Sequence, residues 1–352
     1  MAAKVKSRDY LFDNYKALLI LLVVIGHFTE PCYENNSLLY TVKWFIFSFH
    51  MPAFILISGY FSRHQTSLSK MVQKLLIPYL VFEVIYYLVY TYLIEKETGL
   101  YLLRPKFSLW YLLALFVWRI ITPYVKRIPH YFLVSVTAGL AAGLLTIPSN
   151  FLSIPRILVF YPYFLAGTVL NRTLLEKYHR KPYRILSALG ILVFTLYLIF
   201  DESHKALDAK IFYGRYNYAS LGQTPAEGIL VRLLCYGIGF FLTFAFALLI
   251  SERKTIYSRL GTVTMAIYLF HGLIYNVLKE CTGILSEIES ISASIALLVF
   301  CVLLTMLLSW KPLTRFTNSV SSLSLSSLGW QAQRSLTPAA GLPGNAMFHT
   351  TL

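Results

Sequence analysis

Two stretches near the start of the chain decide its fold: DNYKALLILLVVIGHF, residues 13–28, and FHMPAFILISGYF, residues 49–61. Each is apolar almost throughout, and neither alternates polar with apolar residues as a barrel strand would. A helix needs about 20 such residues to cross the hydrocarbon of a bilayer. Because a helix pairs all its own backbone groups, these stretches predict transmembrane helices.

The composition of the whole chain supports this prediction. Hydrophobic residues make up 57% of the 352 residues and charged residues only 13%, and the mean hydropathy is +0.61. Soluble domains are about a quarter charged, so this composition excludes a soluble globule, and a disordered chain would need low hydrophobicity. The net charge is +15, but the basic residues lie between apolar runs and form no continuous basic face, so no nucleic-acid partner is expected.

The apolar runs predict an all-α, polytopic transmembrane bundle of about ten helices. The approximate spans are Tyr15–Glu30, Ser37–Tyr60, Lys74–Ile94, Leu109–Val125, Tyr131–Ile147, Ile154–Leu170, Ile185–Phe200, Ile229–Ile250, Gly261–Leu278 and Ile291–Trp310. We therefore expect one membrane domain, residues 1–312, followed by a disordered tail, residues 313–352, rich in Ser, Gly and Pro.

Lys and Arg gather in alternate connections of this bundle, starting with the residues before the first span. Cytoplasmic connections carry the excess of Lys and Arg in membrane proteins. The pattern places both termini in the cytoplasm. We expect a multi-pass protein of the plasma membrane, of bacterial origin.

Lys16 and His27 are ionisable residues within the first span. Eleven residues separate them, about three turns or about 16 Å, so they share nearly one helix face. Ionisable groups in a span are functional candidates. We expect Glu30, three residues on, to orient the His27 ring and support a general base. The alternatives are a structural histidine and a lysine that reaches to the membrane boundary.

Other polar residues extend this candidate pocket. Pro52 should kink the second span after His50, while Ser58 and Gly59 permit close approach of another helix. The candidate pocket residues besides Lys16, His27 and Glu30 are Asp13, His50, Ser58, Glu83 and His271.

Arg63 and Lys74 lie at the predicted inner face and could bind anionic phosphates. A purely topogenic role is the alternative. At the outer face, the connection Asp201–Gly228 could form a lid or an aromatic belt. Cys32 and Cys281 both fall near that face, and whether they pair is left open. No metal motif is present.

The motifs together resemble integral-membrane acyltransferase family 3, in its fucose 4-O-acetylase-like branch. Lys16–His27 fits that family's basic residue, ten residues, then histidine. KLLIPYL, WYLLALF, YPYFLAG and AIYLFHG are similar to later segments in family order, so the resemblance runs from Asp9 to Trp310.

The resemblance implies transfer of an acyl group, often acetyl from acetyl-CoA, to a carbohydrate. It makes His27 the catalytic base, Lys16 the basic motif member and His50 part of the second motif. Arg63 is similar to an inner-face basic position, without the family's paired arginines. Acetyl-CoA is expected as co-substrate, with Arg63 and Lys74 as donor contacts, and no cofactor is expected to be bound permanently.

The predicted function is therefore a membrane O-acetyltransferase acting on a cell-envelope or exopolysaccharide sugar. Direct transfer with His27 as general base and a transient acetyl-histidine both remain open. The rival functions are a glycan-precursor transporter or flippase, and a membrane module that senses a ligand without catalysis.

Overall fold

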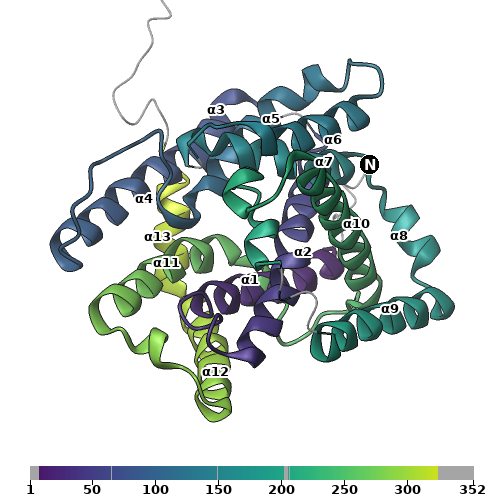
Figure 1. Ribbon diagram of the computed structural model, residues 1–352. Coiled ribbons are helices and arrows are strands. Elements are labelled where there is room, and N and C mark those ends of the chain that lie inside the picture. Colours follow the sequence, from purple (N-terminus) through teal and green to yellow (C-terminus); the bar gives the residue numbers. More distant parts are fainter. Residues whose placement is uncertain (1–7, 65, 149, 202–204, 206, 324–352) are drawn as a thin grey trace, which may run out of the picture.

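The computed structural model describes residues 8–323 except 65, 149, 202–204 and 206. Those residues form helices and connections in one bundle (Figure 1). Eight helical segments among them are long and apolar enough to cross a membrane. The predicted all-α polytopic fold is confirmed.

Seven of these segments are mostly single α-helices. They are α1 (Tyr10–Phe28), α2 (Ser37–Phe61), α5 (Trp110–Val125), α7 (Ile154–Val169), α9 (Lys181–Phe200), α10 (Pro225–Leu249) and α12 (Ile291–Leu308). The eighth, Leu68–Leu93, is built from α3 (Leu68–Met71), the π-helix η1 (Val72–Leu76), α4 (Ile77–Leu88) and the π-helix η2 (Val89–Leu93).

Two shorter helices connect the same two ends of the bundle. The last turns of α6 (Tyr131–Ala141) lie beside the start of α10, where Arg232 donates to the Gly139 carbonyl. The 3-10 helix η9 (Leu260–Thr262), which leads into α11 (Thr264–Val277), packs closely on Asp13 of α1 through Gly261. Glu280, just after the end of α11, pairs with Lys96 at the other end of the bundle. These two helices account for the difference between the eight long segments and the ten predicted spans.

Loops predicted to share a face do lie together. At the N-terminal end of α1, Arg172 pairs with Asp9 at 3.4 Å and with Glu252 at 2.6 Å. At the opposite end, Lys210 pairs with Glu34 at 3.4 Å. The predicted alternation of inner and outer connections is therefore present, and the assignment of the first end to the cytoplasm stays a prediction.

The interior helices are α1 and α2, and α9 and α12 lie at the edge (Figure 1). Where α2 crosses α7, a Cβ on Gly59 or Gly167 would collide with a carbonyl of the other helix, so the close approach predicted at Gly59 is confirmed. Helix α9 is the reverse case, with apolar side chains such as Leu186 and Val193 each 65% exposed. Such a surface suits hydrocarbon.

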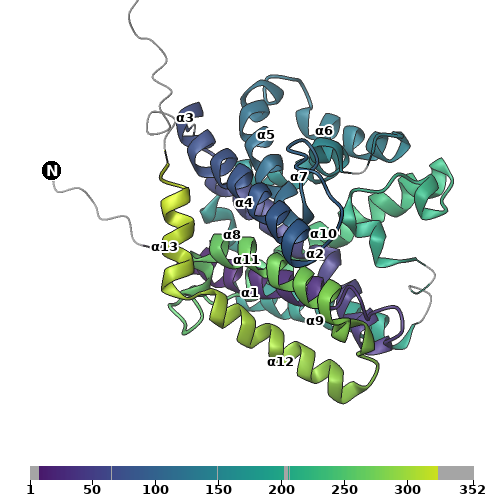
Figure 2. The same cartoon turned by 90° about the vertical axis from the view of Figure 1, so that its left-hand side faces the viewer.

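The start of the predicted disordered tail is ordered instead. Helix α13 (Lys311–Val320) packs against α4 and α11 (Figure 2). Its Phe316 ring contacts Phe82 and Phe270, with centroids 6.3 and 6.0 Å away. This ring contact, together with the burial of Thr317 and Val320, explains why a polar segment forms a helix here. The rest of the predicted tail, from residue 324, lies outside the described residues.

Candidate active site

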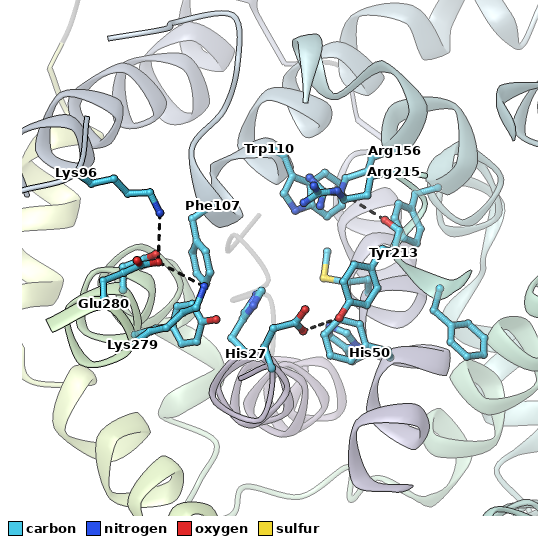
Figure 3. A pocket seen from close by; sticks show the side chains of 17 residues that line it. His27, His50, Lys96, Phe107, Trp110, Arg156, Tyr213, Arg215, Lys279 and Glu280 are labelled. Carbon is cyan, nitrogen blue, oxygen red and sulfur yellow. Dashed lines mark hydrogen bonds and ion pairs between the residues drawn. The ribbon is translucent and has the colours of Figure 1, made fainter. Parts of the chain in front are cut away.

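A cavity of about 330 Å³ lies at the end of α1, on the side of the bundle predicted to be outside (Figure 3). We call it the outer cavity. Its lining comes from α1, α2, α5, α7, α11 and the connection between α9 and α10. The lining residues are His27, Glu30, Phe47, His50, Met51, Lys96, Phe107, Trp110, Arg156, Phe160, Phe212, Tyr213, Arg215, Tyr275, Asn276, Lys279 and Glu280.

His27 stands in the last turn of α1 and faces this cavity. Its ring lies between aromatic neighbours, with centroids 4.5 Å from Phe107 and 6.3 Å from Tyr275. Within the described residues the ring makes no hydrogen bond, although it is only partly exposed. Its nitrogens are therefore available to a molecule in the cavity.

Two further histidines, His50 and His271, lie near His27. The Nδ1 atom of His50 lies 2.7 Å from the Ile46 carbonyl, and that of His271 lies 2.6 Å from the Tyr268 carbonyl. A carbonyl only accepts, so each Nδ1 is assigned the proton and each Nε2 is left as an acceptor. His271 does not line the cavity, but its ring centroid is 5.3 Å from that of His27, and its buried Nε2 has no partner among the described residues.

Glu30 lines the cavity but does not orient His27, contrary to the prediction. Its Oε2 accepts from Lys43 Nζ and from the Tyr213 hydroxyl, each at 2.5 Å. Helix α1 ends at Phe28, so the i,i+3 geometry does not continue to Glu30 and its carboxylate turns towards α2. Glu30 therefore joins α2 to the connection that covers the cavity.

Part of the connection Asp201–Gly228, predicted as a lid or an aromatic belt, lines this cavity. The 3-10 helix η7 (Ala209–Tyr213) places Phe212 and Tyr213 on the cavity, and Arg215 follows. Asp208 caps η7, accepting from Lys210 N at 2.9 Å and from the Tyr33 hydroxyl at 3.2 Å. These bonds hold η7 beside the segment that follows α1 and so keep Phe212 and Tyr213 on the cavity wall.

A second cavity, also about 330 Å³, lies on the predicted inner side. We call it the inner cavity. Lys16, Val23 and Lys74 line it, together with Ser58, whose hydroxyl is hydrogen-bonded to that of Tyr111. Lys16 also pairs with Asp13 at 3.1 Å.

Met51 lines both cavities, so they meet at this side chain. Helix α1 is continuous from Tyr10 to Phe28, and along it Lys16 and Val23 line the inner cavity while His27, four residues on from Val23, lines the outer one. The prediction that Lys16 and His27 share a face is confirmed. One face of α1 thus follows both cavities from end to end.

The two predicted donor contacts do not share a cavity. Arg63 lines a third cavity of about 460 Å³ with Arg119 and Lys126, and its Nη1 donates to the Leu170 carbonyl at 3.0 Å. Lys74 lies on the π-helix η1 instead and faces the inner cavity. Arg63 comes after the end of α2, where the chain turns away from that cavity.

Besides His271, two predicted pocket residues line none of these three cavities. Asp13 forms ion pairs with Arg8 and Lys16, which makes it a partner of the inner lysine. Glu83 is fully buried, accepts from Lys106 N at 2.7 Å and lies 3.7 Å from Lys106 Nζ. It holds the segment that precedes α5.

Sequence reasoning missed Lys43 and Arg215. Lys43 is fully buried within α2 and would have been found by treating every ionisable residue of a span as a candidate. Arg215 lies in a connection without periodicity and gave no comparable signal. Cys32 is buried, Cys281 is exposed and both are free thiols, so they do not pair.

Comparisons with known proteins place the chain in a family. A family model described as an acyltransferase domain matches residues 9–310. Nodulation protein NolL of Sinorhizobium fredii is 42% identical over 62 residues, and that of Mesorhizobium japonicum is 41% identical over 63 residues. Each match covers 17% of this chain and 17% of the relative. No solved structure matches the chain.

Proposed function

Because this chain belongs to the acyltransferase family that the match over residues 9–310 defines, we propose that it transfers an acetyl group from acetyl-CoA to a sugar hydroxyl. It is a multi-pass membrane acyltransferase of eight or more apolar helices. The proposed acceptor is a cell-envelope or exopolysaccharide glycan, and the proposed location is a bacterial plasma membrane.

One observation carries this proposal: the inner and outer cavities meet at Met51, with lysines in one and His27 in the other. A donor with phosphates at one end and a thioester at the other fits such an arrangement. Lys16 and Lys74 would bind the phosphates by charge-assisted hydrogen bonds. The thioester would then reach past Met51 towards the end of α1.

His27 supplies the base in this mechanism. Its free ring nitrogen accepts the proton of the acceptor hydroxyl as the oxygen attacks the thioester carbonyl. The C–S bond then breaks, and the imidazolium returns the proton to the CoA sulfur. Glu30 acts indirectly, because its bonds to Lys43 and Tyr213 hold the cover of the cavity in place.

Purified protein in detergent with labelled acetyl-CoA tests this function. We expect His27→Asn to lower acetyl transfer to a glycan by about 10²- to 10⁴-fold, the usual contribution of a general base. The matched control is His130→Asn, because His130 is exposed on the connection before α6 and Asn tolerates its left-handed conformation, φ 53°.

Both variants should insert and unfold like the wild type. Undiminished transfer by His27→Asn would overturn the assignment of His27. Absence of acetyl transfer and of CoA release by the wild type would overturn the proposed function.

A further inference from the structure

The lysines around the outer cavity have carboxylate partners, whereas its arginines do not. Lys43 pairs with Glu30 at 2.5 Å and Lys96 with Glu280 at 3.3 Å. Arg156 and Arg215 form no ion pair with any described residue. Two guanidinium groups therefore line one cavity without an ion-pair partner among the described residues, although Glu30 and Glu280, paired with lysines, line it too.

The two arginines lie together on one side of the cavity, beside Trp110 (Figure 3). The Arg156 guanidinium lies 4.8 Å from the Trp110 ring centroid, and its Nε is 3.4 Å from the Tyr213 carbonyl. The Nε of Arg215 is buried and has no hydrogen-bond partner among the described residues. An unpaired buried donor is costly, so a ligand that accepts from it would be favoured.

A neighbouring cavity of about 350 Å³ continues this positive region. It shares Phe107, Arg156 and Arg215 with the outer cavity and adds Arg104 and Lys106. No carboxylate lines it within the described part of the chain. Lys106 pairs with Glu83, whereas Arg104, Arg156 and Arg215 have no ion-pair partner among the described residues.

We propose that the outer cavity selects an acceptor that carries an anionic oxygen group, a carboxylate or a phosphate, bound by Arg156 and Arg215. Guanidinium groups fit the planar or tetrahedral oxygens of such anions with paired hydrogen bonds. Trp110 and Tyr213 line the cavity beside these arginines and hold Arg156 by a ring contact and a backbone carbonyl. This inference rests on the proposed function, and it assigns the acceptor class to the cavity that holds His27.

The donor's phosphates are assigned elsewhere. Lys16 and Lys74 line the inner cavity, on the opposite side of Met51 from the arginines. A carboxylate would belong to an acidic sugar, and a phosphate to a sugar linked to a lipid carrier.

Binding measured without chemistry tests the proposal. Wild-type protein in lipid nanodiscs is titrated with sodium glucuronate, methyl phosphate and neutral methyl glucoside, followed by ligand NMR. We expect one or both anions to bind at least about tenfold more tightly than the glucoside, since hydrogen bonds to charged groups are worth about 1.5–3 kcal/mol. Arg215→Gln should remove that preference.

The control is Arg180→Gln, because Arg180 is an exposed arginine at the start of α9, remote from the cavity residues in sequence. It should keep the preference for anions. Acetyl-CoA should bind wild type and Arg215→Gln with the same Kd. The stronger of the two anions identifies an acidic sugar or a phosphate-linked one as the source.

Equal binding of anions and glucoside, or an anion preference that survives in Arg215→Gln, would overturn the proposal. So would a loss of acetyl-CoA binding in Arg215→Gln, because the arginines would then serve the donor. Acetyl transfer and its dependence on His27 are measured separately, so each outcome leaves the proposed function to be judged on its own assay.

Discussion

The inner and outer cavities have similar volumes and meet at Met51, but the basic groups that line them differ in their carboxylate partners. In the inner cavity, Lys16 has a carboxylate neighbour in Asp13 and remains partly exposed. In the outer cavity, His27 lies among aromatic rings, and the two arginines form no ion pair within the part of the chain that the structure describes. This difference fits the proposed roles: the inner cavity takes the phosphates of the donor, and the outer cavity takes the acceptor and the proton that His27 accepts.

The largest expected difference lies in how much the ion pairs near each cavity contribute to the free energy of unfolding. Glu30→Gln leaves the fully buried Lys43 ammonium without its carboxylate, which should cost about 3 kcal/mol of unfolding free energy. Asp13→Asn should cost about 1 kcal/mol or less, because Lys16 reaches water. Unfolding in detergent measures both.

The control for the Glu30–Lys43 pair replaces the lysine by an apolar residue as well. Glu30→Gln combined with Lys43→Met should recover most of the lost stability, since no buried charge is left unpaired. Equal costs for Glu30→Gln and Asp13→Asn would contradict the contrast between the cavities.

Met51 is where the two cavities can be separated. Met51→Trp should fill the meeting point and lower acetyl transfer by about 100-fold, while donor and acceptor each still bind. Met51→Leu conserves volume and should transfer normally. Single-turnover transfer and separate Kd measurements decide between a blocked passage and an unfolded protein, and normal transfer by Met51→Trp would exclude this route.

Removing the inner charge should affect the donor alone. Lys16→Ala should weaken acetyl-CoA binding by about tenfold, the loss of one charge-assisted contact, with anion binding in the outer cavity unchanged. Lys177→Ala, on the exposed helix α8 (Arg172–Tyr178), is a matched control. An acceptor defect in Lys16→Ala would show that the two cavities are one binding site.

The smallest effect concerns the cover of the outer cavity. Burial alone would raise the pKa of the Asp208 carboxyl, but hydrogen bonds from Lys210 and Tyr33 outweigh it and lower that pKa below its ordinary value of 3.8. A lowered pKa stabilises the fold above the unfolded-state pKa, and this contribution is lost as the pH falls through the folded-state value.

Asp208→Asn should therefore reduce stability at pH 7 by less than about 1 kcal/mol. The difference from the wild type should shrink as the pH is lowered below about 4. Thermal unfolding across that range checks it, and a difference that grows on acidification would contradict the assigned role.

The spans and the face shared by Lys16 and His27 follow from the sequence, because apolar length and helical period are local properties. The partner of Glu30 does not, because it depends on where α1 ends and which way the chain then turns. The separation of Arg63 from Lys74 is likewise set by a turn and by the π-helix η1. Arg215 reaches the cavity from an irregular connection whose path only tertiary contacts fix.

The central claim is that donor and acceptor approach His27 from opposite sides. Proteoliposomes of known orientation test it, with labelled acetyl-CoA on one face and glycan on the other. Label should reach the glycan only when acetyl-CoA is on the face of Lys16, and His27→Asn should abolish it. Equal labelling when both substrates are confined to the face of Arg215 would contradict the claim.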